Sequence, residues 1–273
     1  TLDLNGKHGP INALVSLKDE IYAIQDKAIA FLSINPRVQI SGSDGVAVQL
    51  GTGQVLDRYQ YVVVDKGSLN KWSVLATSDA AYFFDLLNKE FSIFRGQVGG
   101  LSDIKQMHSF FYNNIDFDYL EFDNPLIKKG ISSGYDYLND DVFMTFHQGD
   151  KSFTISFNEK AQQFTSFYDY MPSVYISRGD ELITTNPAND SIYRQYAGNY
   201  GEYYGKQYRS SIVFNVNPDP YKSCVFDNIG YKSDVSVNGI DLPDSTLTHI
   251  QAYNEYQNSG EISLVLGRNN NLR

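Results

Sequence analysis

Cysteine is almost missing from this sequence: Cys224 is the only one among 273 residues. A single cysteine excludes an internal disulfide, and it gives no sign of an oxidising compartment. Long hydrophobic runs are missing too, since no apolar stretch approaches the ~20 residues that a membrane helix needs. The sequence therefore predicts neither a disulfide framework nor a membrane segment.

Positive charge is scarce. The chain carries 22 lysines and arginines against 32 aspartates and glutamates, which gives a formal net charge of −10 at pH 7. Binding to duplex DNA requires clustered Lys and Arg that neutralise phosphates, so the sequence predicts no specific nucleic-acid binding. A negative surface repels DNA, which would suit a conduit through which DNA passes without being held.

Signatures of catalysis and metal binding are absent as well. The sequence contains no G-x-S-x-G nucleophile motif. The four histidines show no metal-ligand spacing; they are His8, His108, His147 and His249. We therefore predict no catalytic residue, no metal site and no cofactor, in a protein that is not an enzyme.

The richest acidic stretch is NNIDFDYLEFDNP, residues 113–125. If this stretch is extended, Asp116 and Asp118 lie on one face of a strand. Paired carboxylates can bind Ca²⁺ or hydrolyse glycosides, so a glycoside hydrolase is a rival interpretation. It predicts that activity is lost in Asp116→Asn or Asp118→Asn. We favour a solvated loop with Phe117 and Phe122 as its buried partners.

Aromatic residues are abundant. They make up 14% of the chain, with 21 tyrosines and 17 phenylalanines, and they suit a pleated sheet better than a helix. The one helical candidate is PINALVSLKDEIYAIQ, residues 10–25, whose second half also fits a strand. Short β-rich runs between turn residues fill most of the chain; they are residues 59–65, 80–85, 90–96, 141–148, 152–158, 163–170, 173–177 and 210–217. The sequence predicts a mostly β fold.

Three segments share a hairpin layout: residues 83–94, 134–146 and 156–168. Each has a strand end, an Asp or Asn, a short polar turn and then an apolar residue six positions on. We expect the Asp or Asn to cap the turn by accepting hydrogen bonds from nearby backbone N–H groups. The three capping residues are Asp85, Asp136 and Asn158. The repeat favours a β-propeller-like array of four-stranded antiparallel blades, with a β-sandwich as the alternative.

Large aromatic side chains are expected to fill the cores of these blades. The residues that we assign to the cores are Trp72, Tyr82, Phe83, Phe164, Phe167 and Tyr168.

The stretch SIYRQYAGNYGEYYGKQY, residues 191–208, contains six tyrosines and three glycines. Its glycines allow close approach of the backbone, and its tyrosines bury area while keeping a hydroxyl at the rim. We predict a loop held by aromatic packing that also serves as a subunit interface or a glycan platform. The residues expected to form that surface are Tyr200, Tyr203, Tyr204 and Tyr208.

Several stretches in succession carry a family resemblance. Residues 51–96 have the pattern G-x-G-x-V-L, a short strand, G-x-x-N-x-W-S-V, and then an aromatic pair and Asp. They are followed by GYDYLNDDVFMTF, TISFNEKAQQFTSFYDYMPSVYI and YYGKQYRSSIVFNVNPDPYKSCVFDNIGY. This succession resembles the large tail proteins of crAss-like bacteriophages, known as muzzle or phage stabilisation proteins.

The resemblance implies a structural protein in the virion tail of a short-tailed phage (a podovirus), with β-propeller domains and no active site. The partners that it implies are other copies of the chain, neighbouring tail proteins, and the rest of its own polypeptide after proteolytic cleavage. A carbohydrate-binding β-propeller module used in adsorption to the host surface is the alternative.

Family members are much longer than this chain, so we expect it to be a fragment of a longer polypeptide. Arg273 is the residue that a trypsin-like protease would leave at such an end. Residues 1–233 are expected to form propeller blades with a short N-terminal extension. We expect residues 234–273 to form a further blade, or the start of a segment that continues beyond the fragment.

Overall fold

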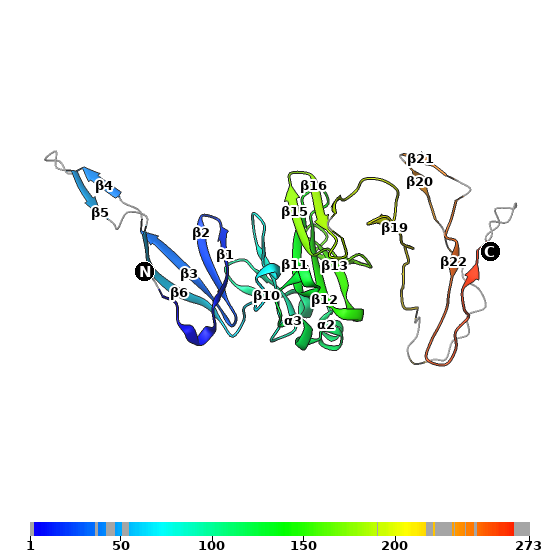
Figure 1. The fold of residues 1–273 in the computed structure, drawn as a ribbon, viewed down its shortest axis with the longest axis horizontal. Coiled ribbons are helices and arrows are strands. Elements are labelled where there is room, and N and C mark those ends of the chain that lie inside the picture. Colours follow the sequence, from blue (N-terminus) through cyan, green and yellow to red (C-terminus); the bar gives the residue numbers. More distant parts are fainter. Residues whose placement is uncertain are drawn as a thin grey trace. The chain divides into compact units, whose positions relative to one another are not determined.

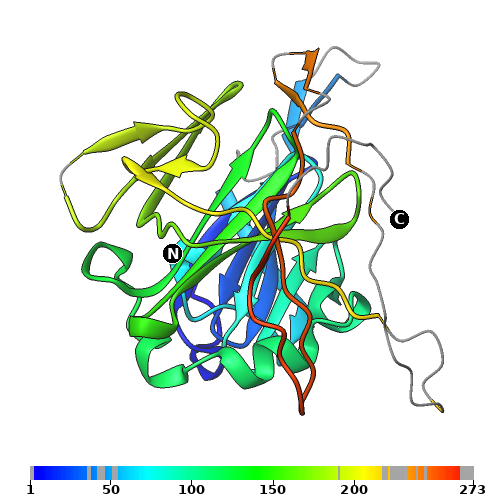
Figure 2. The ribbon, with the colours of Figure 1, turned by 90° about the vertical axis from the view of Figure 1, so that its right-hand side faces the viewer.

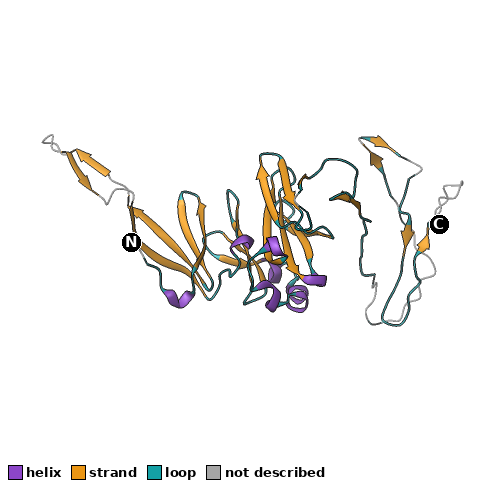
Figure 3. Cartoon of the chain, viewed as in Figure 1, coloured by secondary structure: helices purple, strands orange, loops and turns teal. Residues whose placement is uncertain are grey.

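The computed structural model describes residues 3–35, 38–41, 47–50, 55–189, 191–216, 221, 231, 233–237, 239–242 and 245–264. Cys224 and Arg273 lie outside these residues. The described chain is mostly β, with several small antiparallel sheets and a few short helices (Figure 3). It divides into two compact units, Thr1–Ser210 and Ser211–Arg273. None of the described helices is long and apolar enough to cross a membrane.

The described part of the first unit contains four antiparallel sheets of three or four strands, whose strands lie in the order in which the chain forms them (Figure 1). The first sheet consists of β1 (Ile11–Leu17), β2 (Glu20–Gln25), β3 (Ala28–Asn35) and β6 (Val55–Val64). The second consists of β7 (Leu75–Ala76), β8 (Ala81–Asp85), β9 (Glu90–Phe94) and β10 (Val98–Gly100). The third consists of β11 (Lys129–Asp136), β12 (Asp141–Gln148), β13 (Phe153–Asn158) and β14 (Gln163–Tyr168). The fourth has three described strands, β15 (Val174–Arg178), β16 (Glu181–Thr185) and β17 (Ile192–Arg194).

Short helices and small hairpins fill the connections. The α-helices are α1 (Leu101–Ile104), α2 (His108–Asn114) and α3 (Phe117–Leu120). The 3₁₀ turns are η1 (Gly6–His8), η2 (Lys71–Ser73), η3 (Pro125–Ile127) and η4 (Gly149–Lys151). The isolated hairpins are β4 (Val38–Ser41) with β5 (Ala47–Leu50), and β18 (Glu202–Tyr203) with β19 (Lys206–Gln207).

The helix that we considered for residues 10–25 is wrong: the segment forms the hairpin β1–β2. Lys18 and Asp19 sit at its tip with φ angles of 50° and 66°. Two successive residues with positive φ are typical of the tight turns that match the twist of paired strands. The apolar residues Val15 and Leu17 therefore point to one face of a sheet.

Hydrophobic layers hold the first three sheets face to face. Between the first and second sheets, Tyr22 and Ile24 pack against Phe83 and Phe94. Between the second and third, a larger cluster contains Phe84, Phe91, Met144, Phe146 and Phe157, and the helical segment adds Leu101, Phe111, Ile115 and Leu120. Figure 2 looks along this stack, with the third sheet (green) in front of the first (blue). The second sheet is thus buried on both faces.

The first strands of successive sheets lie next to one another. β1 contacts β7, β7 contacts β11, and β11 contacts β15. β11 and β15 approach closely at Gly134 on β11, where an added Cβ atom would lie 2.3 Å from the Cβ of Tyr175 on β15. A side chain at this position has no room, so glycine sets the spacing of the third and fourth sheets.

We expect Gly134→Ala to lower the free energy of unfolding by about 1–3 kcal/mol, because the added methyl group overpacks this junction. Urea denaturation measures the change. Gly99→Ala is the matched control, since its Cβ would lie 3.5 Å from Ile93 Cγ2, an ordinary contact. An equal loss in both variants would contradict the assigned role of Gly134.

Two of the predicted core residues are wrong. Trp72 is 50% exposed and lies in the turn η2, outside the strands. Phe167 is 54% exposed on β14, which is the edge strand of the third sheet. Tyr82 and Phe83 are buried, whereas Phe164 is partly buried against the larger cluster and Tyr168 is half-buried. Turn geometry and strand position decide these outcomes, and neither is encoded in residue type alone.

The second unit has little regular structure of its own. Its described strands are two residues long: β20 (Ser236–Val237) pairs with β21 (Ile240–Asp241), and β22 (His249–Ile250) with β23 (Ile262–Ser263). The strand predicted for residues 210–217 is wrong over residues 210–216, which form no regular element; Asn217 lies outside the described residues. Pairs this short contribute little stability without further packing.

Candidate functional site

The tyrosine-rich segment 191–208 packs against the third and fourth sheets through its rings. The Tyr203 ring stacks on Tyr170, with centroids 4.3 Å apart and an interplanar angle of 3°. Tyr204 packs on Tyr193 at 4.5 Å, and its hydroxyl donates to Thr184 Oγ1 at 2.9 Å. Rings in contact at these distances stabilise the segment beyond the area that they bury.

A hydrogen bond ties this segment to the hairpin of the third sheet. The Tyr196 hydroxyl donates to Asp136 Oδ2 over 2.6 Å. Tyr196 is 58% exposed as a whole residue, but partial desolvation of its hydroxyl, followed by the bond to Asp136, raises the pKa of Tyr196 well above its ordinary value. The hydroxyl therefore stays protonated and remains a donor throughout the physiological range.

We expect Tyr196→Phe to lower the free energy of unfolding by about 1 kcal/mol, because the variant removes one hydrogen bond to a carboxylate and keeps the ring. Thermal or urea melts measure the change. Tyr200→Phe is the matched control. Because Tyr200 is 80% exposed, this substitution should leave the free energy of unfolding unchanged. An unchanged Tyr196→Phe variant would show that the bond contributes nothing in solution.

The four tyrosines predicted to form one surface are used differently. Tyr203 and Tyr204 pack their rings into a tyrosine cluster with Tyr170 and Tyr193. The ring centroid of Tyr208 lies 6.1 Å from that of Tyr203. Lys206 Nζ lies 4.9 Å from the centre of the Tyr208 ring. Tyr200 is solvent-exposed. An interface or glycan platform on these residues stays a prediction, with Tyr200 as its most accessible ring.

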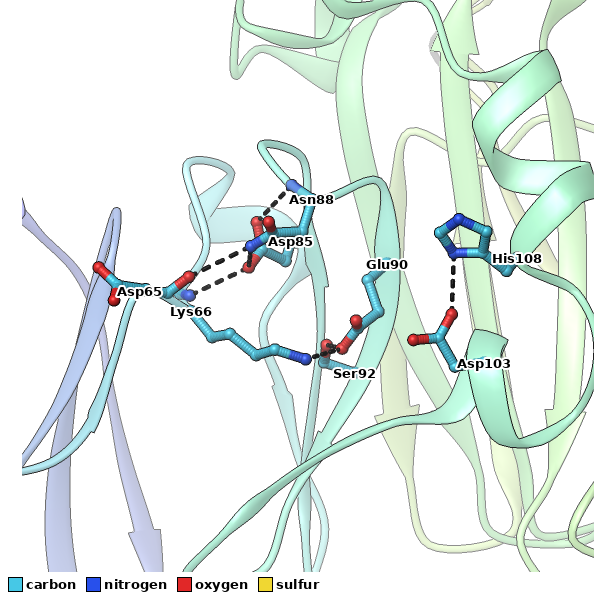
Figure 4. Close-up of polar contacts among 9 residues, drawn as sticks. Asp65, Lys66, Asp85, Asn88, Glu90, Ser92, Asp103 and His108 are labelled. Atoms are coloured by element: carbon cyan, nitrogen blue, oxygen red, sulfur yellow. Dashed lines mark hydrogen bonds and ion pairs between the residues drawn. The ribbon is translucent and has the colours of Figure 1, made fainter.

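Asp85 lies at the tip of the β8–β9 hairpin, where we expected a capping residue. Its Oδ1 accepts the backbone N–H of Asn88 at 3.1 Å, and its Oδ2 accepts Asn88 Nδ2 at 2.7 Å (Figure 4). Oδ2 also lies 3.4 Å from the N–H of Gly67, in the segment that arrives from the first sheet. Burial raises the pKa of Asp85, and the bonds from Asn88 oppose that rise.

Asp136 and Asn158 occupy equivalent turns in the third sheet. Asp136 accepts the N–H of Leu138 at 2.9 Å. Asn158 accepts the N–H of Ala161 at 2.7 Å, and its amide donates to the carbonyl of Asn139 at 2.8 Å. Each side chain thus satisfies backbone groups that the hairpin leaves without a strand partner.

Polar groups between the sheets were not predicted. Lys66 Nζ lies 2.6 Å from Glu90 Oε1, which also accepts Ser92 Oγ at 2.9 Å (Figure 4). Glu159 accepts the hydroxyls of Tyr82 at 2.5 Å and Tyr135 at 2.6 Å, so one carboxylate connects the second and third sheets. Lys66 and Glu90 are 24 positions apart in the sequence, and Tyr82 and Glu159 are 77 positions apart. No local sequence pattern predicts contacts between residues so far apart.

The acidic stretch 113–125 is not an extended strand, so Asp116 and Asp118 do not share a strand face as the rival hydrolase interpretation required. Asp116 is the N-cap of α3 and accepts the N–H of Asp118 at 3.2 Å. Phe117 is partly buried, but Phe122 is exposed, which corrects the prediction that both are buried. Asp116 and Asp118 line a cavity of about 320 Å³ together with Lys89 and Lys151, among others.

No group of three or more His, Cys, Asp or Glu side chains gathers as a metal site in the part of the chain that the structure describes. His147 is 1% exposed, and its Nε2 lies 3.0 Å from the carbonyl oxygen of Pro172. Because a carbonyl only accepts, Nε2 carries the proton of the neutral ring. His108 pairs with Asp103 at 2.8 Å on the surface (Figure 4).

Comparison with protein families decides the relationship of this chain. Residues 1–188 match the family model described as crassvirus muzzle protein, which is more than half of the sequence. The chain belongs to the crassvirus muzzle protein family. Residues 198–266 match a second model, the crassvirus muzzle protein C-terminal domain.

A curated member of the muzzle family is similar along almost the whole chain. The muzzle protein of Bacteroides phage crAss001 is 27% identical over 262 residues, which cover 94% of this chain and 18% of that protein. The chain thus spans less than a fifth of the length of the relative. The boundary between the two family models, at residues 188 to 198, overlaps the start of the tyrosine-rich segment and precedes the division between the two compact units at Ser210.

Proposed function

We propose that this chain is a structural part of the virion tail of a short-tailed, crAss-like phage, where it helps to form the muzzle. Membership of the crassvirus muzzle family over residues 1–188 and 198–266 is the observation that carries the proposal. The role is mechanical and not enzymatic. It accords with carboxylates that cap turns and connect sheets, as Asp85, Asp116 and Glu159 do.

We further propose that the stacked sheets are consecutive blades of a β-propeller that other parts of the longer protein complete. Three features support this arrangement: sheets formed in chain order, a second sheet covered on both faces, and first strands that lie next to one another. In a propeller the first strands of the blades surround the central axis. The division into residues 1–233 and 234–273 belongs to this proposal.

The partners in this role are other copies of the chain, neighbouring tail proteins and the rest of its own polypeptide after proteolytic cleavage. The net charge of −10 suits a wall that DNA passes without adhering to it. Neither a cofactor nor a nucleic-acid sequence is required.

Immunogold electron microscopy of purified phage particles tests the location, with an antibody raised against the 273 residues. We expect label confined to the tail. Particles that stay unlabelled after partial disruption, with reactivity only in the bacterial fraction, would overturn the proposal.

A carbohydrate-binding module is the second candidate, because the exposed ring of Tyr200 is the kind of group on which sugars stack. A glycan array tests it. Binding that disappears in Tyr200→Ala, in a variant that melts like the parent chain, would favour this candidate over a purely structural role.

A further inference from the structure

The segment 211–216 has the composition of a strand but no strand partner in this structure. Ile212 is 83% exposed and Phe214 is 72% exposed, and Val213 and Val216 are exposed beside them. β-branched and aromatic residues of this kind favour a half-buried, pleated surface. Three such side chains in a row, with Val216 following after Asn215, are exposed to water and indicate a surface that another chain covers.

Among the described residues the fourth sheet has three strands, whereas each of the other three sheets has four. It ends at β17, and no further strand pairs with the outer edge of β17 in the described residues. An open edge of this kind presents backbone N–H and C=O groups to any strand that can reach it.

The ladder shows which groups of β17 are available. The N–H of Gln195 donates to Leu182, and the pairs Ile183↔Arg194, Thr184↔Tyr193 and Thr185↔Ile192 follow. Because hydrogen-bonded and non-hydrogen-bonded pairs alternate between antiparallel strands, the N–H groups of Arg194 and Ile192 point away from β16. These two donors face the open edge.

The exposed apolar side chain at that edge of β17 is complementary to the apolar side chains of residues 211–216. Tyr193 faces the tyrosine cluster, so its neighbour Ile192 lies on the opposite face of the sheet, where it is 69% exposed. In an added strand, Ile212, Phe214 and Val216 share one face because side chains alternate. Cross-strand contact between this row and Ile192 would bury apolar groups that are now in water.

We propose that residues 211–216 of one copy of this chain add to β17 of a second copy as the fourth strand of its fourth sheet. Each molecule carries one donor segment and one acceptor edge, so the contact is head-to-tail and can close a ring of copies. The inference deepens the proposed structural role, since it names a partner and a contact for it.

The test uses the 273-residue chain and variants in sedimentation experiments over a concentration series. Phe214→Asp disables the donor segment, and Ile192→Pro removes an edge donor without breaking the β16–β17 ladder. Ile192→Lys is a second acceptor variant, because an edge charge also blocks pairing. Tyr256→Asp, an equivalent change at another exposed aromatic residue, is the control.

We expect the parent chain and Tyr256→Asp to self-associate as concentration rises, whereas Phe214→Asp and both Ile192 variants stay monomeric. An equal mixture of Phe214→Asp with Ile192→Pro or Ile192→Lys should form dimers and nothing larger, because one donor and one acceptor remain. A monomeric parent chain, mixtures that stay monomeric, or Ile192 variants that associate like the parent would overturn the inference. Tail labelling by immunogold is independent of all these results, so it tests the structural role separately.

Discussion

Replacement of Phe91 by alanine is expected to lower the free energy of unfolding by about 3–5 kcal/mol, since it leaves a large cavity in a close-packed core. The Phe91 ring is fully buried between the second and third sheets. Its ring centroid lies 6.3 Å from that of Phe157 and 5.4 Å from that of Phe164, and the rings of Tyr82 and Phe111 are also close. Urea denaturation of the variant and the parent chain measures the loss.

Phe167→Ala is the control for this prediction. It deletes the same atoms from a ring that is largely exposed at the edge of the third sheet. We expect a loss of about 1 kcal/mol or less, because little buried surface is lost. If both variants lost the same stability, the face-to-face packing of the second and third sheets would be contradicted.

The second large effect concerns pH. Burial lowers the pKa of His147 from 6.5 to about 4, and a smaller contribution comes from the charge of Lys128. Between these two values the unfolded chain binds a proton that the folded chain does not, so stability rises with pH. The contribution is complete above pH 6.5 and is lost as the pH falls toward 4, by about 3 kcal/mol in total.

His147→Gln isolates this contribution, since the amide can still donate to the Pro172 carbonyl but does not titrate. We expect the stability of the parent chain to fall relative to the variant from pH 6.5 downward. The difference removes the effects of buried carboxyls such as Asp85 and Asp123, whose raised pKa values act in the opposite direction. Parallel stability profiles would show that His147 titrates normally in the folded chain.

Local patterns predicted most strands and turns. The segments 83–94, 134–146 and 156–168 all form hairpins, because period-two alternation and a turn-capping Asp or Asn act over a few residues. The mostly β composition also followed from the abundance of Tyr and Phe. Expectations failed where local preference was ambiguous, as in residues 10–25, whose apolar spacing fits a helix and a hairpin.

Contacts between distant segments were beyond the reach of the sequence. Glu159 looks like an ordinary turn residue until the fold brings Tyr82 and Tyr135 to it. Gly134 gives no sign of its contact with Tyr175, since the two lie in different sheets. The strand predicted for residues 210–217 failed over residues 210–216 for another reason, because a strand requires a partner and this segment pairs with no strand in the described residues.

Cryo-electron microscopy of the tail of the intact phage tests the central claim most directly. We predict density for this chain in the tail wall, with its four sheets as consecutive blades and their first strands around a common axis. Absence of the chain from the tail, or sheets arranged there without a common axis, would contradict the account.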